Sequence, residues 1–471
     1  MKIYNTLTRK KQEFKPQKNQ EIKMYTCGVT VYDDCHIGHA RSLYIFEVIR
    51  KYLKYRGFKV DFIRNITDID DKIINKARQW SKDKNISLEE GFEEVRKTYI
   101  DSYYQDLESL KIPKADIEPK ATENIPEMIK FAQGLIAKDI AYEKQGNVYF
   151  SVRKFKDYGK LSGKKIDDLL SSVRIEEDPL KEDPLDFALW KAAKENEPSW
   201  QSPWGKGRPG WHIECSVMSQ KYLKTDTLDI HGGGRDLVFP HHENEIAQSE
   251  ALTGKPFANF WIHHGLLTIN GQKMAKSLGN FYTIKDVINK YPADILKIFY
   301  LQAHYSSPVD FSWEKMEEAK SAYERIYLLV NKLKKMSLPA CETKIGGIEE
   351  IRAQFQESMD DDFNTPKALA VLFELVNMTN KLLETEDSQS EIKLGKIVNL
   401  MTVITDVFGF TFPEIDSGSM DNEKISELIN LRLKLRKEKK FAEADKIRKE
   451  LENKGVILED TKDGTEWRRK L

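Results

Sequence analysis

The spacing of apolar residues predicts a strand, a helix and a second strand near the start of the chain. Residues 21–27 alternate between apolar and polar side chains, which is typical of a strand with one buried face. From about residue 39, apolar side chains recur every four residues as in a helix, and Gly57 supplies a natural helix end. Residues 59–64 form the next strand. Together these elements predict a parallel βαβ unit with a right-handed crossover.

Similar patterns continue through the middle of the chain. We expect helices at residues 69–78 and 88–110, a hairpin at 142–150, and strands at 227–231 and 260–269. Gly232, Gly233 and Gly234 are expected to open a tight connection after the strand at 227–231. A helix is expected to follow, with Pro240 in its first turn.

Helical spacing dominates after about residue 307. The predicted helices are at residues 316–336, 349–359, 366–384 and 392–408, which is enough for a bundle. Lys and Arg balance Asp and Glu at 75 each over the whole chain, but between Leu431 and Leu471 there are 14 basic against 9 acidic residues. This local excess predicts a basic terminal surface, the kind that attracts nucleic acid.

These elements indicate an α/β protein. We expect a Rossmann-like doubly wound parallel sheet split by an insertion, then an α-helical bundle and a small C-terminal α/β module. A length of 471 residues favours about three domains. The expected segments are residues 1–111 for the first half of the Rossmann domain, 112–204 for a connective insertion, 205–306 for the second half with a lysine-motif loop, 307–415 for the bundle, and 416–471 for the terminal module.

Composition narrows the setting of the protein. No stretch has the roughly 18 consecutive apolar residues of a membrane span, and the basic N-terminus lacks the apolar run of a signal peptide. The four cysteines, Cys27, Cys35, Cys215 and Cys341, lie far apart, which favours a reducing compartment and metal binding or catalysis over a disulfide framework. We therefore expect a cytoplasmic protein with no membrane partner.

Two short motifs hold candidate phosphate-binding groups. His36-Ile37-Gly38-His39 stands at the predicted helix start, where phosphate is favoured and Gly38 lets a ligand approach the backbone. Lys273-Met274-Ala275-Lys276 follows a predicted turn, and its lysines suit a mobile cover over a triphosphate. Taken alone, the first motif is equally compatible with a capping turn bearing two surface histidines. The second alone favours a solvated charged loop.

Four further residues form a candidate metal site. Cys27 precedes the histidine motif, Cys215 opens the second half of the sheet, and His241 and Glu245 are four apart on one helix face. Two thiolates, an imidazole and a carboxylate would suit tetrahedral zinc. From residue types alone, structurally buried cysteines are an equally good interpretation.

The two phosphate motifs lie at opposite ends of a split nucleotide-binding fold, and in this the chain resembles the class I aminoacyl-tRNA synthetases. The histidine motif is complete, whereas Ala275 stands where the family pattern often has serine. Residues 27–39, 211–216 and 231–245 resemble the cysteinyl-tRNA synthetase family in particular, and the likeness extends over essentially the whole chain.

The resemblance implies a role for each candidate residue. It implies Cys27, Cys215, His241 and Glu245 as zinc ligands, leaves Cys35 and His242 outside that set, and leaves Cys341 as an inert core residue of the bundle. It places Thr67, Trp211, His231 and Asp236 around bound cysteine, with Trp211 as a wall and Asp236 holding the amino group. It assigns catalysis to His36, His39, Lys273 and Lys276, and nucleotide binding to His36, Gly38, His39 and Lys276.

The resemblance also implies a reaction and its partners. ATP and L-cysteine would give cysteinyl-adenylate, and the cysteinyl group would pass to the 3′ end of tRNA(Cys), with Mg²⁺ accompanying ATP. One zinc ion per chain would separate cysteine from serine, since zinc prefers a thiolate to a hydroxyl. The bundle would contact the tRNA stem and the terminal module its anticodon, in a monomer. A pyridoxal phosphate side activity has candidate lysines in Lys72, Lys76, Lys273 and Lys276.

Two other functions stay open on the sequence. A cysteine ligase with the same adenylate chemistry could use an amino sugar as acceptor, but the bundle and basic module favour tRNA. A non-catalytic zinc-dependent RNA-binding protein is the second alternative, and the presence of both phosphate motifs disfavours it.

Overall fold

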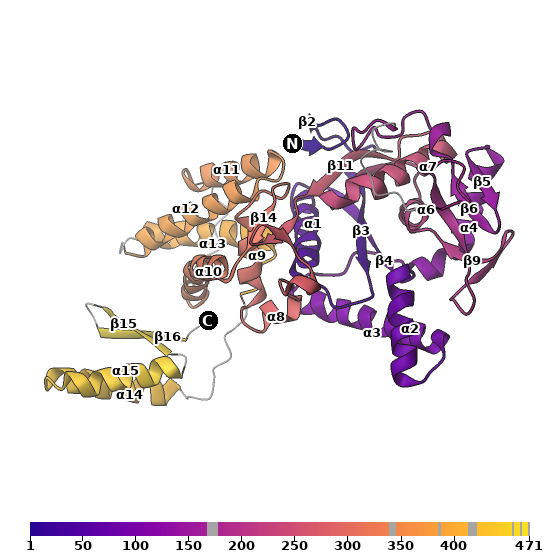
Figure 1. The fold of residues 1–471 in the computed structure, drawn as a ribbon. Helices are drawn as coiled ribbons and strands as arrows, with labels where there is room; N and C mark the ends of the chain where they lie inside the picture. The colour runs from indigo at the N-terminus through magenta and orange to yellow at the C-terminus, as the bar shows by residue number, and fades with distance from the viewer. Residues whose placement is uncertain are drawn as a thin grey trace. The chain divides into compact units, whose positions relative to one another are not determined.

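The computed structural model describes residues 1–166, 178–338, 345–384, 388–412, 422–454, 456–461 and 464–469. The chain divides into two compact units, Met1–Phe410 and Thr411–Leu471. The first unit contains a parallel sheet, an inserted antiparallel sheet and a helical bundle, whereas the second is a small helical and hairpin module (Figure 1). Cys341, expected in the bundle core, lies outside the described residues.

Four parallel strands form the central sheet, in the order β11-β10-β3-β4. Their bounds are Ala258–His264 for β11, Leu228–Gly234 for β10, Glu21–Thr30 for β3 and Lys59–Thr67 for β4. The crossover helix α1 (Ile37–Tyr55) joins β3 to β4, and Figure 1 shows α1 and α6 (Trp211–Leu223) on either side of the sheet. The predicted βαβ unit and Rossmann-like sheet are therefore confirmed, and ligands are expected at the carboxyl ends of these strands.

Helix α1 begins where the sequence predicts because His36 caps it. The His36 side chain accepts hydrogen bonds from the backbone N–H groups of Gly38 and His39, and the His39 side chain accepts one from the backbone of His36. A reciprocal cap of this kind satisfies donors that a helix N-terminus otherwise leaves without partners. The turn that carries the histidine motif is therefore fixed by the motif's own side chains.

The glycines after the strand at 227–231 do not open a turn. Gly232, Gly233 and Gly234 continue β10, and the strand ends only at Gly234. A Cβ atom on Gly232 would lie 2.3 Å from Cε1 of Phe46 in α1. The glycine is needed because helix and strand pack closely there, which local sequence does not reveal.

The region beyond β10 carries two of the candidate metal ligands, His241 in a turn and Glu245 in the helix that follows. Short irregular turns at Arg235–Leu237 and Val238–His242 precede α7 (Glu243–Thr253). The regular helix thus begins later than Pro240, which was expected in its first turn. Figure 1 shows α7 close to α6.

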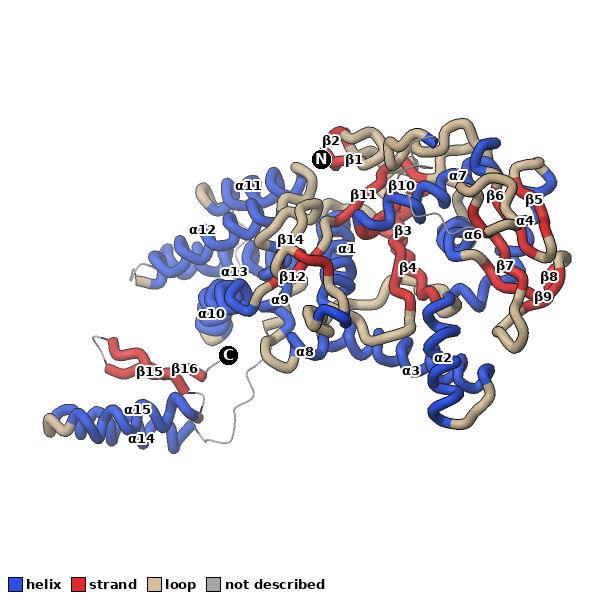
Figure 2. The backbone as a smooth tube through the Cα atoms, in the orientation of Figure 1, coloured by secondary structure: helices blue, strands red, loops and turns tan. Residues whose placement is uncertain are grey.

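The insertion contains more strands than the sequence predicts. The expected hairpin is formed by β5 (Ala141–Lys144) and β6 (Asn147–Phe150). It is joined by β7 (Phe187–Ala192), β9 (Gly205–Pro209) and β8 (Trp200–Ser202) into a five-stranded sheet next to α4 (Ile125–Ala137) (Figure 2). Residues 197–211, which are rich in Pro and Trp, contain both β8 and β9. In β9, Gly207 leaves room for the ring of Trp190.

Shorter elements complete the first unit around the central sheet. The N-terminal hairpin pairs β1 (Lys2–Asn5) with β2 (Lys10–Glu13), and helices α2 (Asp71–Lys84) and α3 (Leu88–Ser109) follow β4. The predicted strand at 260–269 is two elements, because Gly265 separates β11 from β12 (Leu267–Ile269). The remaining elements are β13 (Gln272–Lys273), β14 (Val309–Phe311), α8 (Ile284–Ile288), α9 (Ala293–Leu301), and single turns at Ala121–Asn124, Val152–Lys154 and Lys276–Leu278.

The predicted bundle consists of α10 (Trp313–Lys334), α11 (Ile348–Asp360), α12 (Thr365–Leu383) and α13 (Ser388–Phe408). It packs directly on the crossover helix of the sheet. The Tyr44 hydroxyl donates to the Phe408 carbonyl at 2.8 Å, and the Tyr52 hydroxyl donates to Asp360 at 2.6 Å. The bundle and the parallel sheet therefore share α1, which explains why they form one compact unit.

The second unit has its own small core. Helices α14 (Asn422–Lys437) and α15 (Phe441–Asn453) pack with a hairpin of β15 (Val456–Thr461) and β16 (Gly464–Arg469). The buried side chains are Ile425, Ile429, Ile447, Leu451, Val456 and Leu458. Helices and strands in one module match the expected C-terminal α/β module.

Candidate functional site

A cavity of about 490 Å³ opens at the carboxyl ends of β3 and β10. Eleven of the sequence-predicted site residues line it: Cys27, His36, Gly38, His39, Thr67, Trp211, Cys215, Asp236, His241, Lys273 and Lys276. His231 and Glu245 are fully buried and are not part of its lining. Residues that are far apart in the sequence thus meet in one cavity, as the Rossmann-like fold predicts.

His36 and His39 lie side by side at the start of α1, with ring centroids 3.7 Å apart. Their Nδ1 atoms both accept backbone N–H groups, His36 from Gly38 at 3.0 Å and His39 from His36 at 3.3 Å. A neutral imidazole whose Nδ1 accepts must carry its proton on Nε2. Each ring therefore has one N–H donor left for a ligand, such as a phosphate oxygen.

Both rings are held neutral. Burial lowers the pKa of His36 to about 4, and it lowers the pKa of His39 well below its ordinary value, helped by the neighbouring His36. Two adjacent imidazolium ions would repel each other in this enclosed position. The pair therefore acts through hydrogen bonds at neutral pH and contributes no positive charge.

Gly38 serves the histidines more directly than the sequence indicates. A Cβ atom at this position would lie 2.8 Å from Cε1 of His36 and 3.1 Å from Cε of Met274. The glycine was expected to let a ligand approach the backbone, but here the space is taken by the His36 ring. Any larger residue would displace the ring that caps the helix.

The lysine motif forms one rim of the cavity. Lys276 is paired with Asp33 and also lies over the ring of Phe281. The hydrogen bond to Asp33 raises the pKa of Lys276, so the ammonium is charged at neutral pH. Lys273 lies close enough to His36 to lower the pKa of that ring further. The motif thus brings two cations to the edge where the two histidine donors lie.

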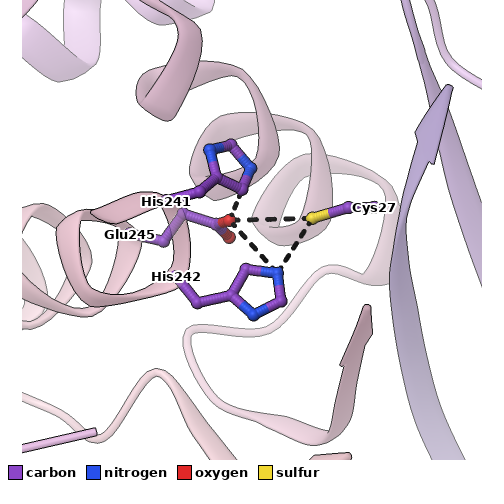
Figure 3. Close-up of side chains that lie close together, drawn as sticks. All are labelled: Cys27, His241, His242 and Glu245. Carbon is purple, nitrogen blue, oxygen red and sulfur yellow. Dashed lines mark hydrogen bonds and ion pairs between the residues drawn. The ribbon is translucent and has the colours of Figure 1, made fainter. Parts of the chain in front are cut away.

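The predicted metal ligands come together at the same cavity, and Figure 3 shows three of them, Cys27, His241 and Glu245. Sγ of Cys27 lies 3.7 Å from Sγ of Cys215 and 3.7 Å from Oε1 of Glu245. Nε2 of His241 lies 3.5 Å from Sγ of Cys215 and 2.9 Å from Oε1 of Glu245. These donor atoms come from β3, α6, the turn before α7, and α7 itself.

The donor distances fit a tetrahedral metal ion. With zinc–sulfur bonds of about 2.3 Å and zinc–nitrogen bonds of about 2.0 Å, tetrahedral geometry puts two sulfurs about 3.8 Å apart and a sulfur and a nitrogen about 3.6 Å apart. The observed 3.7 Å and 3.5 Å lie close to these values. A set of two thiols, an imidazole and a carboxylate is also the chemistry that zinc prefers.

Ionisation of the set favours a cation as well. Burial opposes charge on every member, but His231 and His241 lower the pKa of Glu245 to about 2, and Cys27 and His241 lower the pKa of Cys215 to about 6. Burial and the neighbouring Cys215 raise the pKa of the Cys27 thiol. Glu245 and Cys215 in turn raise the pKa of His241 to about 10 despite its burial, so without a metal the group holds one carboxylate and one thiolate beside one imidazolium ion. A divalent cation would take the place of the imidazolium proton.

His242 lies close to the cluster, although the resemblance leaves it outside the ligand set. Its Nε2 atom lies 3.2 Å from Sγ of Cys27 and 3.9 Å from Oε1 of Glu245 (Figure 3). Within the part of the chain that the structure describes, Cys27, His241, His242 and Glu245 form a group that could hold a metal ion. Cys35, by contrast, is buried just before α1. Its carbonyl accepts the N–H of Ile284, the first residue of α8, at 2.9 Å.

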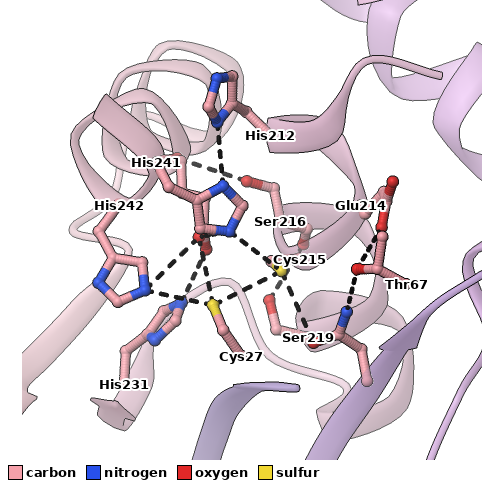
Figure 4. A network of polar contacts seen from close by, with 12 residues as sticks. Cys27, Thr67, His212, Glu214, Cys215, Ser216, Ser219, His231, His241 and His242 are labelled. Atoms are coloured by element: carbon pink, nitrogen blue, oxygen red, sulfur yellow. Dashed lines mark hydrogen bonds and ion pairs between the residues drawn. The ribbon is translucent and has the colours of Figure 1, made fainter. Parts of the chain in front are cut away.

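Residues behind the ligands fix their orientation (Figure 4). Nε2 of His231 lies 2.7 Å from Oε2 of Glu245, and Nδ1 of His212 lies 3.0 Å from Nδ1 of His241. His231 was expected beside the bound cysteine, whereas the structure places it behind Glu245, away from the cavity. Partners of this kind set ligand orientation and are expected at metal sites.

The other residues expected around cysteine do face the cavity. Trp211 is 39% exposed and stacks on His241, with ring centroids 4.2 Å apart. The Thr67 hydroxyl donates to Glu214 at 2.9 Å, and Asp236 lines the same cavity. An aromatic wall and a carboxylate beside a metal-binding cluster suit a small amino acid with a free amine.

Sequence reasoning missed three residues around this cluster. His212 and Glu214 lie in a stretch in which Cys215 was the only predicted metal ligand. His263 lies in a strand that was predicted only from its apolar residues. Eight of the nine histidines in the chain line the cavity or belong to the contacts around the metal-binding cluster. That clustering on both sides of one sheet edge was the available signal for the missed imidazoles.

Comparison with known proteins agrees with this geometry. A family model described as the tRNA synthetases class I (C) catalytic domain matches residues 13–321. A DALR domain model matches residues 354–412, and a cysteinyl-tRNA ligase anticodon binding domain model matches residues 422–468. In the described part of the chain, no helix has both the length and the apolar character of a membrane span.

Individual proteins extend the comparison along the whole chain. The chain is 50% identical to the cysteine–tRNA ligase of Persephonella marina over 100% of both chains. It is 47% identical to the cysteine–tRNA ligase of Aquifex aeolicus, over 100% of this chain and 99% of that one. Its fold resembles Mycobacterium tuberculosis methionyl-tRNA synthetase in complex with methionyl-adenylate, with a TM-score of 0.59 at 12% identity over 83% of this chain and 90% of that one.

The arrangement of the site and the match to the catalytic model point the same way. The parallel sheet brings both phosphate motifs to one cavity, and relatives about half identical to this chain match it from end to end. The chain therefore belongs to the cysteine–tRNA ligase family of class I aminoacyl-tRNA synthetases, and it is a ligase.

Proposed function

We propose that the protein activates L-cysteine with ATP and transfers the cysteinyl group to tRNA(Cys), selecting cysteine over serine with a zinc ion. The observation that carries this proposal is one shared cavity. It is lined by the paired imidazole donors and by three of the four clustered ligands, with Glu245 buried directly behind them. The Cys27–Cys215 and Cys215–His241 distances suit a tetrahedral ion. This shared cavity supports a phosphate-binding edge and a thiolate-selecting edge within one small volume.

In the activation step, the cysteine carboxylate oxygen attacks the α-phosphorus of ATP, and the bond to the pyrophosphate oxygen breaks. His36 and His39 donate their Nε2–H groups to phosphate oxygens, where negative charge builds up. Lys273 and Lys276 stabilise the leaving pyrophosphate. Mg²⁺ accompanies the triphosphate. The protein works by positioning and by stabilising charge, without forming a covalent bond to either substrate.

Zinc would be held by Cys27, Cys215, His241 and Glu245. The ion would supply a soft Lewis acid that prefers the thiolate of cysteine to the hydroxyl of serine. Trp211 closes the side of this pocket by stacking on His241. Asp236 faces the same space and would hold the substrate amino group. Because selectivity arises at the binding step, the chain needs no editing domain.

Transfer to tRNA(Cys) would use the rest of the chain. We propose residues 1–111 and 205–306 as the two halves of the catalytic domain, 112–204 as the connective insertion, 307–415 as the bundle on the tRNA stem, and 416–471 as the anticodon-binding module. The basic excess between Leu431 and Leu471 supports an RNA-facing role for the last of these. We propose that the protein works as a monomer in the cytoplasm.

The alternative acceptor, an amino sugar, is less well supported. It would give no role to a separately folded basic module with its own core. A pyridoxal phosphate activity stays a prediction. Of its candidate lysines, Lys72 lines the cavity with its ammonium 5.1 Å from the centre of the Tyr32 ring, and Lys76 lies outside the lining.

Metal analysis and one matched pair of variants test the zinc assignment. We expect about one zinc ion per purified wild-type chain. Cys215→Ala should lose the ion and cysteine-dependent ATP–pyrophosphate exchange, because it removes a donor from the cluster. Cys35→Ala changes an equally buried thiol outside the cluster and should keep both. Full zinc content in Cys215→Ala would overturn the assignment.

A further inference from the structure

A continuous line of hydrogen-bonding groups runs from the N-terminal turn to the metal-binding cluster. Oγ1 of Thr6 lies 2.8 Å from Nδ1 of His263, and Nε2 of His263 lies 2.7 Å from Nδ1 of His242. Nε2 of His242 lies 3.2 Å from Sγ of Cys27. Three contacts thus join four residues that are distant in the sequence, and both imidazoles use both of their ring nitrogens.

The line is enclosed and its outer end is anchored. His242 and His263 are buried, and the ring of Trp261 packs beside both of them. Thr6 follows β1 directly, and its backbone N–H donates to the carbonyl of Trp261 at 3.0 Å. Asn5 fixes the same turn, because its side chain donates to the Asn259 carbonyl and accepts the Trp261 N–H. The Thr6 hydroxyl is therefore held in place by the edge strand of the sheet.

The chemistry at the two ends of the line decides in which direction its hydrogen bonds are donated. A neutral imidazole has one N–H donor and one acceptor nitrogen, whereas a thiolate can only accept. If Cys27 is a thiolate, His242 must donate from Nε2 and accept at Nδ1. His263 must then donate from Nε2 and accept at Nδ1, so the Thr6 hydroxyl supplies the first hydrogen of the series.

We propose that Thr6 and His263 are positioning residues for the metal site, acting through His242, which donates an N–H···S hydrogen bond to the Cys27 thiolate. The proposal rests on the proposed zinc site and adds residues to it that lie outside the ligand set. In this arrangement His242 is a donor to a ligand and not itself a ligand. Cys215 remains the fourth donor to the ion.

Distances support this division of roles. The 3.2 Å from His242 Nε2 to Cys27 Sγ is shorter than the roughly 3.6 Å that separates a sulfur and a nitrogen ligand on tetrahedral zinc. His242 Nε2 lies 3.9 Å from Oε1 of Glu245 and His241 Nε2 lies 2.9 Å from it, and the second distance is closer to the roughly 3.3 Å expected of two light-atom ligands. Cys215 meets the tetrahedral distances to both Cys27 and His241.

The line has a consequence for the ion. A hydrogen bond to a thiolate sulfur draws charge away from it, which stabilises the thiolate against protonation and leaves the ion more electrophilic. Removing the outer hydroxyl leaves His263 Nδ1 buried without a donor, a loss that is transmitted to His242. Partners one step beyond the ligands typically contribute about 10–100-fold to metal affinity.

Metal binding and a cobalt spectrum of the full-length protein test the proposal. Thr6→Val removes the hydroxyl and keeps the side-chain shape, Thr6→Ser restores the hydroxyl, and Thr8→Val removes a hydroxyl that bonds Gln12 in the same turn. We expect Thr6→Val to bind zinc about 10-fold more weakly by chelator competition. Its cobalt-substituted form should show the thiolate-to-cobalt charge-transfer band shifted to lower energy. Thr6→Ser and Thr8→Val should match the wild type.

A second variant guards against a folding defect. His263→Phe replaces the ring in its aromatic surroundings and should lower zinc affinity at least as much as Thr6→Val, with thermal unfolding of the metal-free proteins as the folding check. Wild-type affinity and band position in both Thr6→Val and His263→Phe would overturn the proposal. A wild-type cobalt spectrum that shows a single thiolate ligand would also overturn the proposal, because His242 would then be a metal ligand in place of Cys215. A wild type that binds no metal would instead overturn the proposed zinc site.

Discussion

His36 uses its two ring nitrogens for two different tasks. Nδ1 caps α1 by accepting the Gly38 and His39 N–H groups, and Nε2 is left to face the cavity. Asparagine is also a good N-cap, but it is too short to present a donor at the position of Nε2. The substitution His36→Asn therefore separates the structural task from the catalytic one.

We expect His36→Asn to retain the stability of the protein and to lose activity. Removing one donor from a developing negative charge typically costs about 10²–10³-fold in rate. The measurement is cysteine-dependent ATP–pyrophosphate exchange together with thermal unfolding. His36→Ala serves as the comparison, because it loses the cap as well and should also unfold more easily. Unchanged exchange in His36→Asn would remove His36 from the mechanism.

The lowered pKa of His36 has a consequence for stability. Burial lowers this pKa to about 4, whereas an exposed histidine titrates near 6.5. The unfolded chain therefore binds the proton more readily, and the stabilising contribution is complete above about pH 6.5 and lost as the pH falls towards 4. His36→Asn lacks this titration. Denaturant unfolding of the metal-free proteins at about pH 7 and pH 4.5 should show a smaller loss for the variant than for the wild type; equal losses would contradict the buried neutral imidazole.

The lysine-motif loop is held by one ion pair across the cavity rim. Lys276 pairs with Asp33 after β3, and the adjacent Asp34 pairs with Lys285 and accepts from Ser102. A triphosphate bound at the rim would compete with Asp33 for the Lys276 ammonium and would be repelled by its carboxylate. The observed pair thus holds the loop in an arrangement that ATP has to displace.

Asp33→Asn should therefore tighten ATP binding. Exposed ion pairs contribute about 0.2–1 kcal/mol, so the expected gain is at most about fivefold in affinity. Equilibrium ATP binding measures this, and Asp34→Asn is the matched control because it removes an equal charge whose partner lies outside the loop. Equal tightening in both variants would indicate a general charge effect and refute a specific competition at Lys276.

The elements that the sequence predicts well are those whose signals are local. The spacing of apolar residues and the helix-capping residues predict strand β3, helix α1 and strand β4. The same signals predict the helices of the bundle. The glycines of β10 were misinterpreted as a turn because their reason is the Phe46 ring on another element. Strand β9 is hard to predict because it contains Gly207, which leaves room for the ring of Trp190 on β7, and β8 is only three residues long.

The candidate site divides in the same way. The motifs indicate which ligands and phosphate-binding groups to expect, and the fold brings most of them to one cavity. The place of His231 behind Glu245 and the approach of His242 to Cys27 depend on contacts between separate elements. Spacing along one chain does not encode those contacts, so the supporting residues could be identified only from the structure.

Over the whole molecule, activation and RNA recognition are assigned to separately folded units. The second unit has its own apolar core, and among the described residues the cavity is lined only by those of the first unit. Each unit should therefore keep its structure when the other is altered. Loss of one should affect only the step that uses it.

Deleting residues 422–471 should spare the first step and impair the second. We expect wild-type ATP–pyrophosphate exchange, because the cavity is intact. Aminoacylation of tRNA(Cys) should fall by on the order of 10-fold or more, as expected for losing about 1.4 kcal/mol or more of recognition. Full aminoacylation by the truncated protein would contradict an anticodon-reading role, and loss of exchange would contradict the independence of the two units.

The central claim is that a metal ion in the cavity selects cysteine by its thiolate. ATP–pyrophosphate exchange driven by cysteine and by serine, measured before zinc removal, after it and after zinc is restored, tests this most directly. We predict that zinc-loaded protein prefers cysteine by on the order of 10⁴-fold, that chelation abolishes cysteine-driven exchange, and that added zinc restores it. Serine-driven exchange equal to that with cysteine, or full cysteine-driven exchange without zinc, would contradict the claim.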